Sequence, residues 1–381
     1  MDYCYIKIEK ELKKRNFKGN RCMNNRGLKY DTGDKDILKW IKRKLIAYKL
    51  GFNITPQVID IHPVANICNL KCAWCIGKSD SNTPVYMKWH DLEKVFNSIF
   101  EVGKEEFWPS EIHFCGCNSD PLLNKEVMKN AIQYLNERNV TIEIISNGVC
   151  LKDYISNNIE QLLLVDKISI SLDVVNEQDF YSYKSLNSKI CLKDIINSIE
   201  KICQNKYKTN SQLSIYTTFV ATPETYSKEE WLQNFTELKN IGVNHVQVRN
   251  DYTNYDKNFY NKVKLDIEEI AIKLNAKEIN YKESNSFDIK YNEYMPRNSE
   301  FEHCLGYRIW PTISADFLMY PCAHTANEYF VSLLDLKKTN YYDIYSLDDF
   351  SYYEKEPCKN CSKKCPSLIY YINQLKDIDV L

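Results

Sequence analysis

The chain has 381 residues, of which 44% are hydrophobic and 13% aromatic, so it can form one large domain with a smaller one. Its net charge is -1, with basic residues interspersed among acidic ones, which argues against a nucleic-acid-binding surface or a membrane-binding patch. Residues 1–14 lack the apolar run of a signal peptide, and no stretch approaches the length of a membrane span. We therefore expect a cytoplasmic protein with neither a nucleic-acid nor a membrane partner.

The first 55 residues differ in pattern from the rest of the chain. Residues 1–55 are charged and helical in periodicity, most clearly over Asp36–Leu50, and we expect them to form a mostly helical N-terminal extension. From residue 56, short runs typical of strands alternate with longer helical stretches. The predicted strands are Gln57–His62, Glu111–Cys115, Thr141–Ser146, Lys167–Leu172, Leu213–Val220 and Val243–Val248. The predicted helices between them are Leu92–Val102, Lys125–Arg138, Asp153–Leu163, Leu192–Asn205 and Lys228–Ile241.

This alternation predicts βα units built around a parallel sheet. Six units are too few for a closed eight-stranded barrel, so we expect an α/β fold with a partial (β/α)6 TIM-like barrel over residues 56–255. The C-terminal ends of its strands would then carry the active site. We expect residues 256–303 to form a linker with one helix, Asp256–Lys273, and residues 304–381 to form a small cysteine-rich domain.

Fifteen cysteines are a high number for a cytosolic protein, where they indicate metal binding or catalysis rather than disulfides. Three of them, Cys68, Cys72 and Cys75, directly follow the first predicted strand. Three thiolates in so short a loop can hold a four-iron cluster and leave one iron open to a small molecule. A zinc site would usually need a fourth ligand, which the local sequence lacks. A structural zinc loop and buried free thiols are the alternatives.

The Cys-x3-Cys-x2-Cys spacing, with Trp74 before the last cysteine, resembles the signature of the radical S-adenosylmethionine (SAM) superfamily. The resemblance implies a [4Fe–4S] cluster at these cysteines, whose open iron binds the amino and carboxylate groups of SAM. It also implies that an electron from the cluster cleaves SAM and that the resulting 5′-deoxyadenosyl radical abstracts hydrogen from a substrate. A flavodoxin- or ferredoxin-type protein would supply the electron.

The ends of the next strands carry candidate cofactor-binding residues. After the second strand, Asn118, Ser119 and Asp120 stand where the family has a Gly-Gly-Glu motif, and Pro-Leu follows as in the family. Asp120 can accept hydrogen bonds from an ammonium group, although it could instead cap the helix that follows. By the same resemblance the further candidates are Cys115, Ser146, Asn147, Ser169, Ser171 and Asp173. Turn chemistry explains Ser146 and Asn147 equally well.

A second group of cysteines lies near the C-terminus and comprises Cys304, Cys322, Cys358, Cys361 and Cys365. A β-hairpin predicted around Ser314–Asp316 would bring Cys304 and Cys322 together, and Cys358 and Cys361 would complete four ligands. The arrangement resembles the SPASM and twitch domains of the superfamily, which implies an auxiliary [4Fe–4S] cluster, and five cysteines favour the single-cluster twitch form. A structural zinc site is the alternative.

The resemblance also bears on the substrate. Twitch enzymes act on carbohydrates, cyclitols and nucleotides, so we expect oxidation or epimerisation at a C–H carbon of a small polar substrate. Cys117 and Cys365 are candidates for returning a hydrogen atom, which an epimerase needs, and Arg249 could clamp a carboxylate or form only a surface ion pair. One alternative is a maturase acting on a ribosomally made precursor peptide. Another is a non-radical iron–sulfur or zinc protein that binds a partner.

Overall fold

The computed structural model describes residues 56–75, 77, 83–101, 108–184, 190–251, 254, 256–276, 287–292, 310–323, 326 and 332–341. Their main feature is a ten-stranded sheet with the strand order β12-β11-β10-β1-β4-β5-β6-β7-β8-β9. The sheet strands are β1 (Val58–Ile61), β4 (Glu111–Phe114), β5 (Thr141–Ser146), β6 (Lys167–Asp173), β7 (Ser214–Ala221), β8 (His245–Asn250), β9 (Asp288–Asn292), β10 (Thr312–Ile313), β11 (Leu318–Tyr320) and β12 (Leu334–Asp335). A separate two-stranded sheet pairs β2 (Val64–Ala65) with β3 (Val85–Tyr86).

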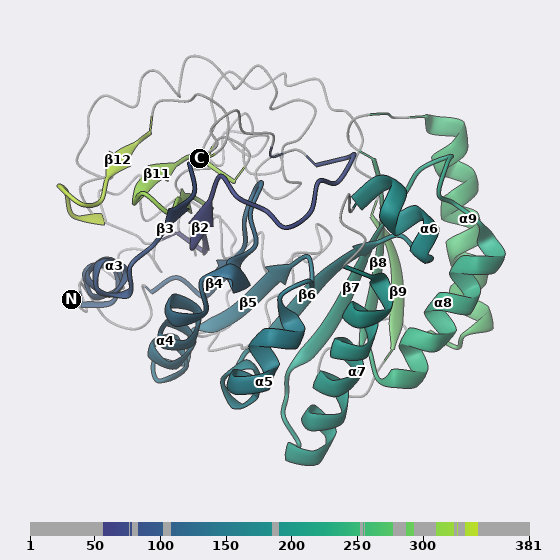
Figure 1. Ribbon diagram of the computed structural model, residues 1–381, viewed down its shortest axis with the longest axis horizontal. Coiled ribbons are helices and arrows are strands. Elements are labelled where there is room, and N and C mark those ends of the chain that lie inside the picture. Colours follow the sequence, from purple (N-terminus) through teal and green to yellow (C-terminus); the bar gives the residue numbers. More distant parts are fainter. Residues whose placement is uncertain are drawn as a thin grey trace, which may run out of the picture.

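Helices alternate with the strands. They are α3 (Trp89–Glu101), α4 (Lys125–Asn136), α5 (Leu151–Leu162), α6 (Glu177–Asp179), α7 (Leu192–Thr209), α8 (Lys228–Ile241) and α9 (Lys257–Lys273), with the short turns η2 (Pro121–Leu123) and η3 (Phe180–Lys184). Figure 1 shows α4, α5, α7, α8 and α9 following one another along one side of the sheet. Strand residues that alternate toward these helices, such as Ile112, Ile144 and Ile168, are fully buried in the hydrophobic core.

The strand pairing confirms a parallel α/β sheet. All neighbours from β10 through β1 to β9 are parallel, whereas β11 and β12 add in antiparallel orientation. Within the described part of the chain, β9 and β12 form the two ends of the sheet and do not pair with each other, so the barrel is open. The partial barrel predicted from the sequence is therefore confirmed.

The elements predicted from the sequence are present, with ends that differ by a few residues. The predicted hairpin around Ser314–Asp316 is also present, as the antiparallel pair β10 and β11. The strands β2, β3, β9 and β12 were not predicted. Of these, β9 lies in the segment expected to be a linker and pairs in parallel with β8. Residues 1–55 and 342–381 lie outside the described residues. None of the described helices is long and apolar enough to cross a bilayer.

The sheet face opposite the helices, here called the inner face, is strongly polar. The register aligns Asp60, His113, Glu143 and Lys167 in one row across β1, β4, β5 and β6. His113 lies at the centre of an ion network, with Nδ1 at 3.3 Å from Asp60 Oδ1 and Nε2 at 3.0 Å from Glu111 Oε2. Glu143 also accepts a hydrogen bond from Ser169 Oγ at 2.7 Å and contacts Lys167 Nζ at 2.8 Å.

These charges are buried, so their stability depends on mutual compensation. Burial by itself lowers the pKa of His113, but the carboxylates of Glu143, Asp60 and Glu111 outweigh it and raise the pKa to about 10. His113 is therefore an imidazolium ion at neutral pH in the folded protein. The pKa of the folded state lies above the ordinary value of 6.5, so protonation of His113 stabilises the fold fully below pH 6.5 and progressively less up to about pH 10.

We predict that His113→Gln lowers the free energy of unfolding of the apo protein by about 3–5 kcal/mol at pH 6, because it leaves buried carboxylates without their cation. The difference from wild type should shrink as the pH is raised to 10. Urea unfolding at both pH values measures it. His90→Gln, at an exposed position of α3, is the matched control and should change little. A deficit for His113→Gln of the same size at both pH values would contradict an imidazolium at this position.

Candidate functional site

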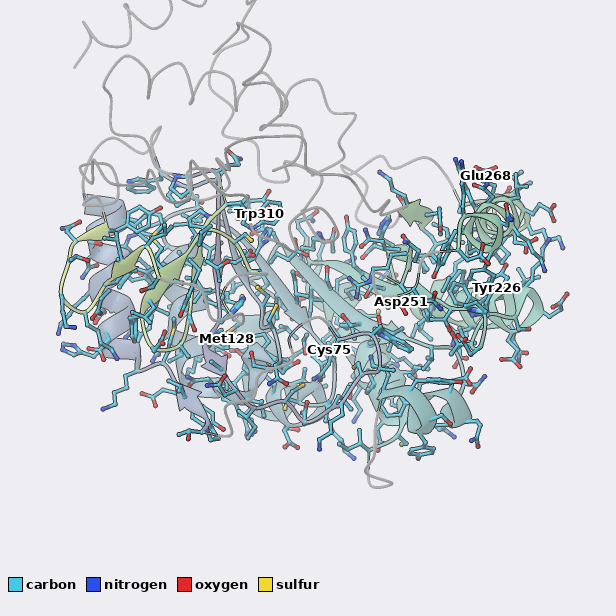
Figure 2. The ribbon with its side chains drawn as sticks, turned by 90° about the horizontal axis from the view of Figure 1, so that it is seen from above. Cys75, Met128, Tyr226, Asp251, Glu268 and Trp310 are labelled. Atoms are coloured by element: carbon cyan, nitrogen blue, oxygen red, sulfur yellow. The ribbon has the colours of Figure 1, made fainter. Side chains whose placement is uncertain are left out.

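The loop between β1 and β3 carries three half-buried cysteines, Cys68, Cys72 and Cys75. Burial raises the pKa of Cys72 to about 12, and negative charge on Asp173, Cys75 and Cys68 acts in the same direction. All three thiols belong to one short stretch of this loop, Cys68–Cys75. The thiols must lose their protons to bind a metal, and the positive charge of an iron centre promotes that loss. In the view of Figure 2, Cys75 appears near the middle of the molecule.

Backbone hydrogen bonds hold this loop against η3. The amide of Lys71 donates to the carbonyl of Lys184 at 2.9 Å, and the amide of Ala73 donates to the carbonyl of Tyr183 at 2.8 Å. The indole of Trp74 stacks on the ring of Tyr183 with 6.1 Å between centroids. These contacts fix the backbone on both sides of Cys72.

The same loop passes very close to the segment after β4. A Cβ on Gly77 would lie 2.5 Å from the amide nitrogen of Asn118 and 2.9 Å from Cys117 Cβ, so only glycine fits at position 77. Ile67 forms an isolated parallel β-bridge with Ser119. The predicted cofactor motif therefore directly adjoins the cysteine loop.

Asp120 is fully engaged by its own surroundings. It is buried, and its Oδ1 accepts a hydrogen bond from the amide of Leu122 at 2.9 Å as the N-cap of η2. Its Oδ2 accepts from Ser146 Oγ at 2.8 Å and from the amide of Asn147 at 2.7 Å. Burial raises the pKa of Asp120, while these hydrogen bonds lower it. The helix-capping alternative is thus realised, and Asp120 in addition holds the turn after β5.

Asn147 connects that turn to the cysteine loop. Its Nδ2 donates to Asn69 Oδ1 at 2.7 Å and lies 3.5 Å from Cys68 Sγ. Asn69 in turn donates to Cys150 Sγ at 3.3 Å. Gly148, which follows Asn147, has φ +84° and leaves no room for a Cβ against Ile195. Asn69 and Cys150 were not predicted as site residues, because nothing local in the sequence distinguishes them.

The three predicted residues of β6 lie in different surroundings. Ser169 donates to Glu143 deep in the sheet, and Ser171 Oγ accepts from Thr218 Oγ1 at 3.4 Å. Asp173 follows a bulge, has φ +64°, and pairs through Oδ2 with Lys184 Nζ at 2.9 Å. Its Oδ1 lies 3.8 Å from Arg249 Nη2. Asp173 is therefore closer to the cysteine loop than Ser169 is.

Two cysteines follow β4. Cys115 is buried, and burial raises the pKa of its thiol well above the ordinary value, as do the nearby charges of Asp60 and Glu143 to a smaller extent. Cys117 is half-buried, and its Sγ donates to the carbonyl of Ala323 at 3.4 Å. This contact brings Cys117 next to the segment that contains Cys322. The other C-terminal cysteines predicted as ligands or catalytic thiols lie outside the described residues: Cys304, Cys358, Cys361 and Cys365.

The donors at this site fit an iron–sulfur cluster together with a polar organic ligand. Three half-buried free thiols in one loop provide soft ligands of the kind that iron–sulfur clusters use. Asp173 Oδ1 and Ser119 Oγ are buried and make no hydrogen bond within the described residues. Both atoms are acceptors of the kind that an ammonium or hydroxyl group satisfies.

Comparison with known proteins agrees with this geometry. Residues 63–233 match the family model of the radical SAM superfamily. The S-adenosylmethionine-dependent nucleotide dehydratase of Fibrobacter sp. (strain UWH6) is 25% identical over 123 residues, a match that spans 32% of this chain and only 35% of that relative.

Two solved structures share the fold. SuiB of Streptococcus suis, bound to the precursor peptide SuiA, has a TM-score of 0.59 at 13% identity, over 94% of this chain and 80% of that chain. The protein anSMEcpe with bound AdoMet has a TM-score of 0.52 at 14% identity, over 81% of this chain and 88% of that chain. The family model and the shared fold thus place residues 63–233, the part of the chain that contains Cys68, Cys72 and Cys75, in the radical SAM superfamily.

Proposed function

We propose that this radical SAM enzyme abstracts hydrogen from a C–H bond of a small polar substrate, of carbohydrate or cyclitol type, with oxidation or epimerisation as the outcome. One observation carries the substrate class. Toward the C-terminal ends of the strands, the register aligns Ser171, Thr218, Gln247 and Lys290 in a row across β6, β7, β8 and β9. Four neighbouring hydrogen-bonding side chains on the inner face suit a ligand rich in hydroxyl or amino groups.

In this proposal Cys68, Cys72 and Cys75 hold the [4Fe–4S] cluster. When bound, the cluster supplies the electron that cleaves SAM to methionine and the 5′-deoxyadenosyl radical. Asn147 is 3.5 Å from Cys68 Sγ and would orient that ligand, while Asp120 fixes Asn147 through its backbone amide. A flavodoxin- or ferredoxin-type protein would donate the electron.

SAM would be held by the groups around the loop. The buried oxygens of Asp173 and Ser119 offer acceptors for its ammonium or hydroxyl groups. Arg249 is a quarter exposed and close to Asp173, so it could bind a carboxylate of SAM or of the substrate. Cys115, Ser146, Ser169 and Ser171 stay in the proposal as cofactor-binding residues; of these, Ser146 Oγ donates to Asp120 and Ser169 Oγ donates to Glu143.

An auxiliary [4Fe–4S] cluster at Cys304, Cys322, Cys358 and Cys361 remains part of the proposal. Its support is indirect: Cys322 follows the predicted hairpin, and the adjacent Ala323 contacts Cys117 beside the cysteine loop. Such a cluster could accept an electron from a substrate radical or return one.

The proposal predicts about eight irons per chain after anaerobic reconstitution, from two four-iron clusters. Replacing Cys68, Cys72 and Cys75 together by alanine should leave about four, because only the loop cluster loses its ligands. Cys203→Ala, at a buried position of α7, is the matched control and should keep the full iron content. Metal analysis for iron and zinc measures the content of each variant. A wild-type protein that holds only zinc would contradict the proposed iron–sulfur clusters.

Asp120 yields a second prediction. Asp120→Asn keeps the shape of the side chain but replaces one acceptor oxygen by an amide, so the turn that carries Asn147 loses a charge-assisted hydrogen bond. We expect SAM to bind about ten-fold more weakly, since such a bond contributes about 1.5 kcal/mol. Iron content should stay unchanged. Calorimetric titration with SAM measures the affinity. Asp153→Asn, on the exposed face of α5, is the control. An unaltered affinity of Asp120→Asn for SAM would show that Asp120 does not contribute to the cofactor site.

Cys117 yields a third prediction, which separates epimerisation from oxidation. If Cys117 returns the hydrogen atom, turnover in deuterated water should place one deuterium on the product carbon, because the thiol exchanges with solvent. Cys117→Ala should then form 5′-deoxyadenosine in a single turnover without epimerised product. Cys191→Ala, before α7, is the control. A carbonyl product without deuterium would indicate a dehydrogenase instead.

A peptide substrate is the second candidate, and the fold match to SuiB bound to its precursor peptide, over 94% of this chain, favours it. The purified enzyme should be offered a co-encoded precursor peptide beside sugars and cyclitols. A mass change, cross-link or inverted residue in the peptide alone would replace the small-substrate proposal by a maturase.

A further inference from the structure

Lys184 is a buried cation beside the cysteine loop that the proposed chemistry does not use. It ends η3 and is 1% exposed. Its ammonium group pairs with Asp173 Oδ2 at 2.9 Å and donates to the carbonyls of Leu172, at 3.1 Å, and of Ser171. Its three N–H donors are therefore matched by three acceptors, which leaves none for SAM or a substrate. Lys184 must act through the groups it contacts.

The first of these groups is the cysteine loop. The carbonyl of Lys184 accepts from the amide of Lys71, and the neighbouring carbonyl of Tyr183 accepts from the amide of Ala73. Cys72 lies between these two anchored residues. The position of Lys184 and the position of the Cys72 thiol are thus set by the same backbone contacts.

The second group is Asp173. Lys184 takes Oδ2, and the other oxygen, Oδ1, remains without a hydrogen bond and faces Arg249 at 3.8 Å. Without the ammonium group, the buried carboxylate of Asp173 would keep, among the described residues, one ion-pair partner, the partly exposed Arg249. The positive charge also opposes the effect of burial on the pKa of Cys72.

We propose that Lys184 is a positioning residue of the cluster site: its buried ammonium group supplies a fixed positive charge beneath Cys72 and holds Asp173 in its orientation. The inference rests on the proposed ligation of a cluster by Cys68, Cys72 and Cys75. Reduction adds an electron to a thiolate-bound cluster that is already negative. A fixed positive charge nearby stabilises the reduced form, and a fixed negative charge destabilises it.

The test is the midpoint potential of the loop cluster in the full-length, reconstituted protein without SAM, followed by electron paramagnetic resonance during redox titration. Lys184→Met should shift the potential to a more negative value, since it removes the cation and unmasks Asp173. Lys184→Arg should restore most of the wild-type value. Lys206→Met is the matched control, because Lys206 is a buried lysine of α7 that bonds Asn244. Its potential should equal that of wild type.

Asp173→Asn tests whether the potential changes because of charge or because the cysteine loop becomes looser. It removes the negative partner and should shift the potential in the positive direction, opposite to Lys184→Met. Shifts of the same sign in both variants, or a wild-type potential in Lys184→Met, would overturn the proposal. If Lys184→Met retains no cluster, a nearly wild-type potential in Lys184→Arg together with a positive shift in Asp173→Asn supports the proposal, and a negative shift in Asp173→Asn overturns it. If the reconstituted wild-type protein holds no iron, the proposed function is wrong. That outcome differs from a wrong role of Lys184, in which wild type holds the cluster but the potentials do not shift as expected.

Discussion

The hydrogen bonds from Lys71 and Ala73 to the last turn of η3 are the contacts on which the site depends. The cysteine loop has no regular structure around Cys72, and it buries the apolar side chains of Leu70 and Trp74 in the core. Polar and backbone contacts hold it further: with η3, with Asn147 and with Ser119. Each of these segments follows a different strand, so these contacts are all made only when the parallel sheet has formed.

The parallel sheet requires charged side chains on its inner face to be paired. Its register brings charged side chains of four adjacent strands into one row on the inner face, where water is excluded from His113 and Glu143. Such a row is stable only when acids and bases alternate, as they do from Asp60 to Lys167. Nearer the C-terminal ends the row from Ser171 to Lys290 is polar but carries less charge. The deeper part of the barrel is thus closed by ion pairs, which leaves the upper part for ligands.

The central strands could be predicted from the sequence because each is a short run with clear ends and alternates apolar residues, which face the helices, with polar ones. The strand β9 was missed, because its residues Asp288–Asn292 are mostly polar and look like a linker until they pair with β8. The cysteine motif could be predicted because its signal is local. Lys184, Asn69 and Cys150 could not, since their roles come from contacts between segments distant in sequence. For the same reason the periodicity that grouped Ser169 with Asp173 could not show the bulge between them.

The departure from the Gly-Gly-Glu motif has a physical explanation in this chain. Asn118 has φ +54°, a conformation that favours glycine and that asparagine tolerates better than most residues. The backbone of the cysteine loop can approach this motif closely because Gly77 has no Cβ that would collide with the amide of Asn118. Asp120, shorter than glutamate, bonds the turn at Ser146 and Asn147 rather than extending past it. The motif thus keeps its backbone shape, and its acid holds the turn that carries Asn147.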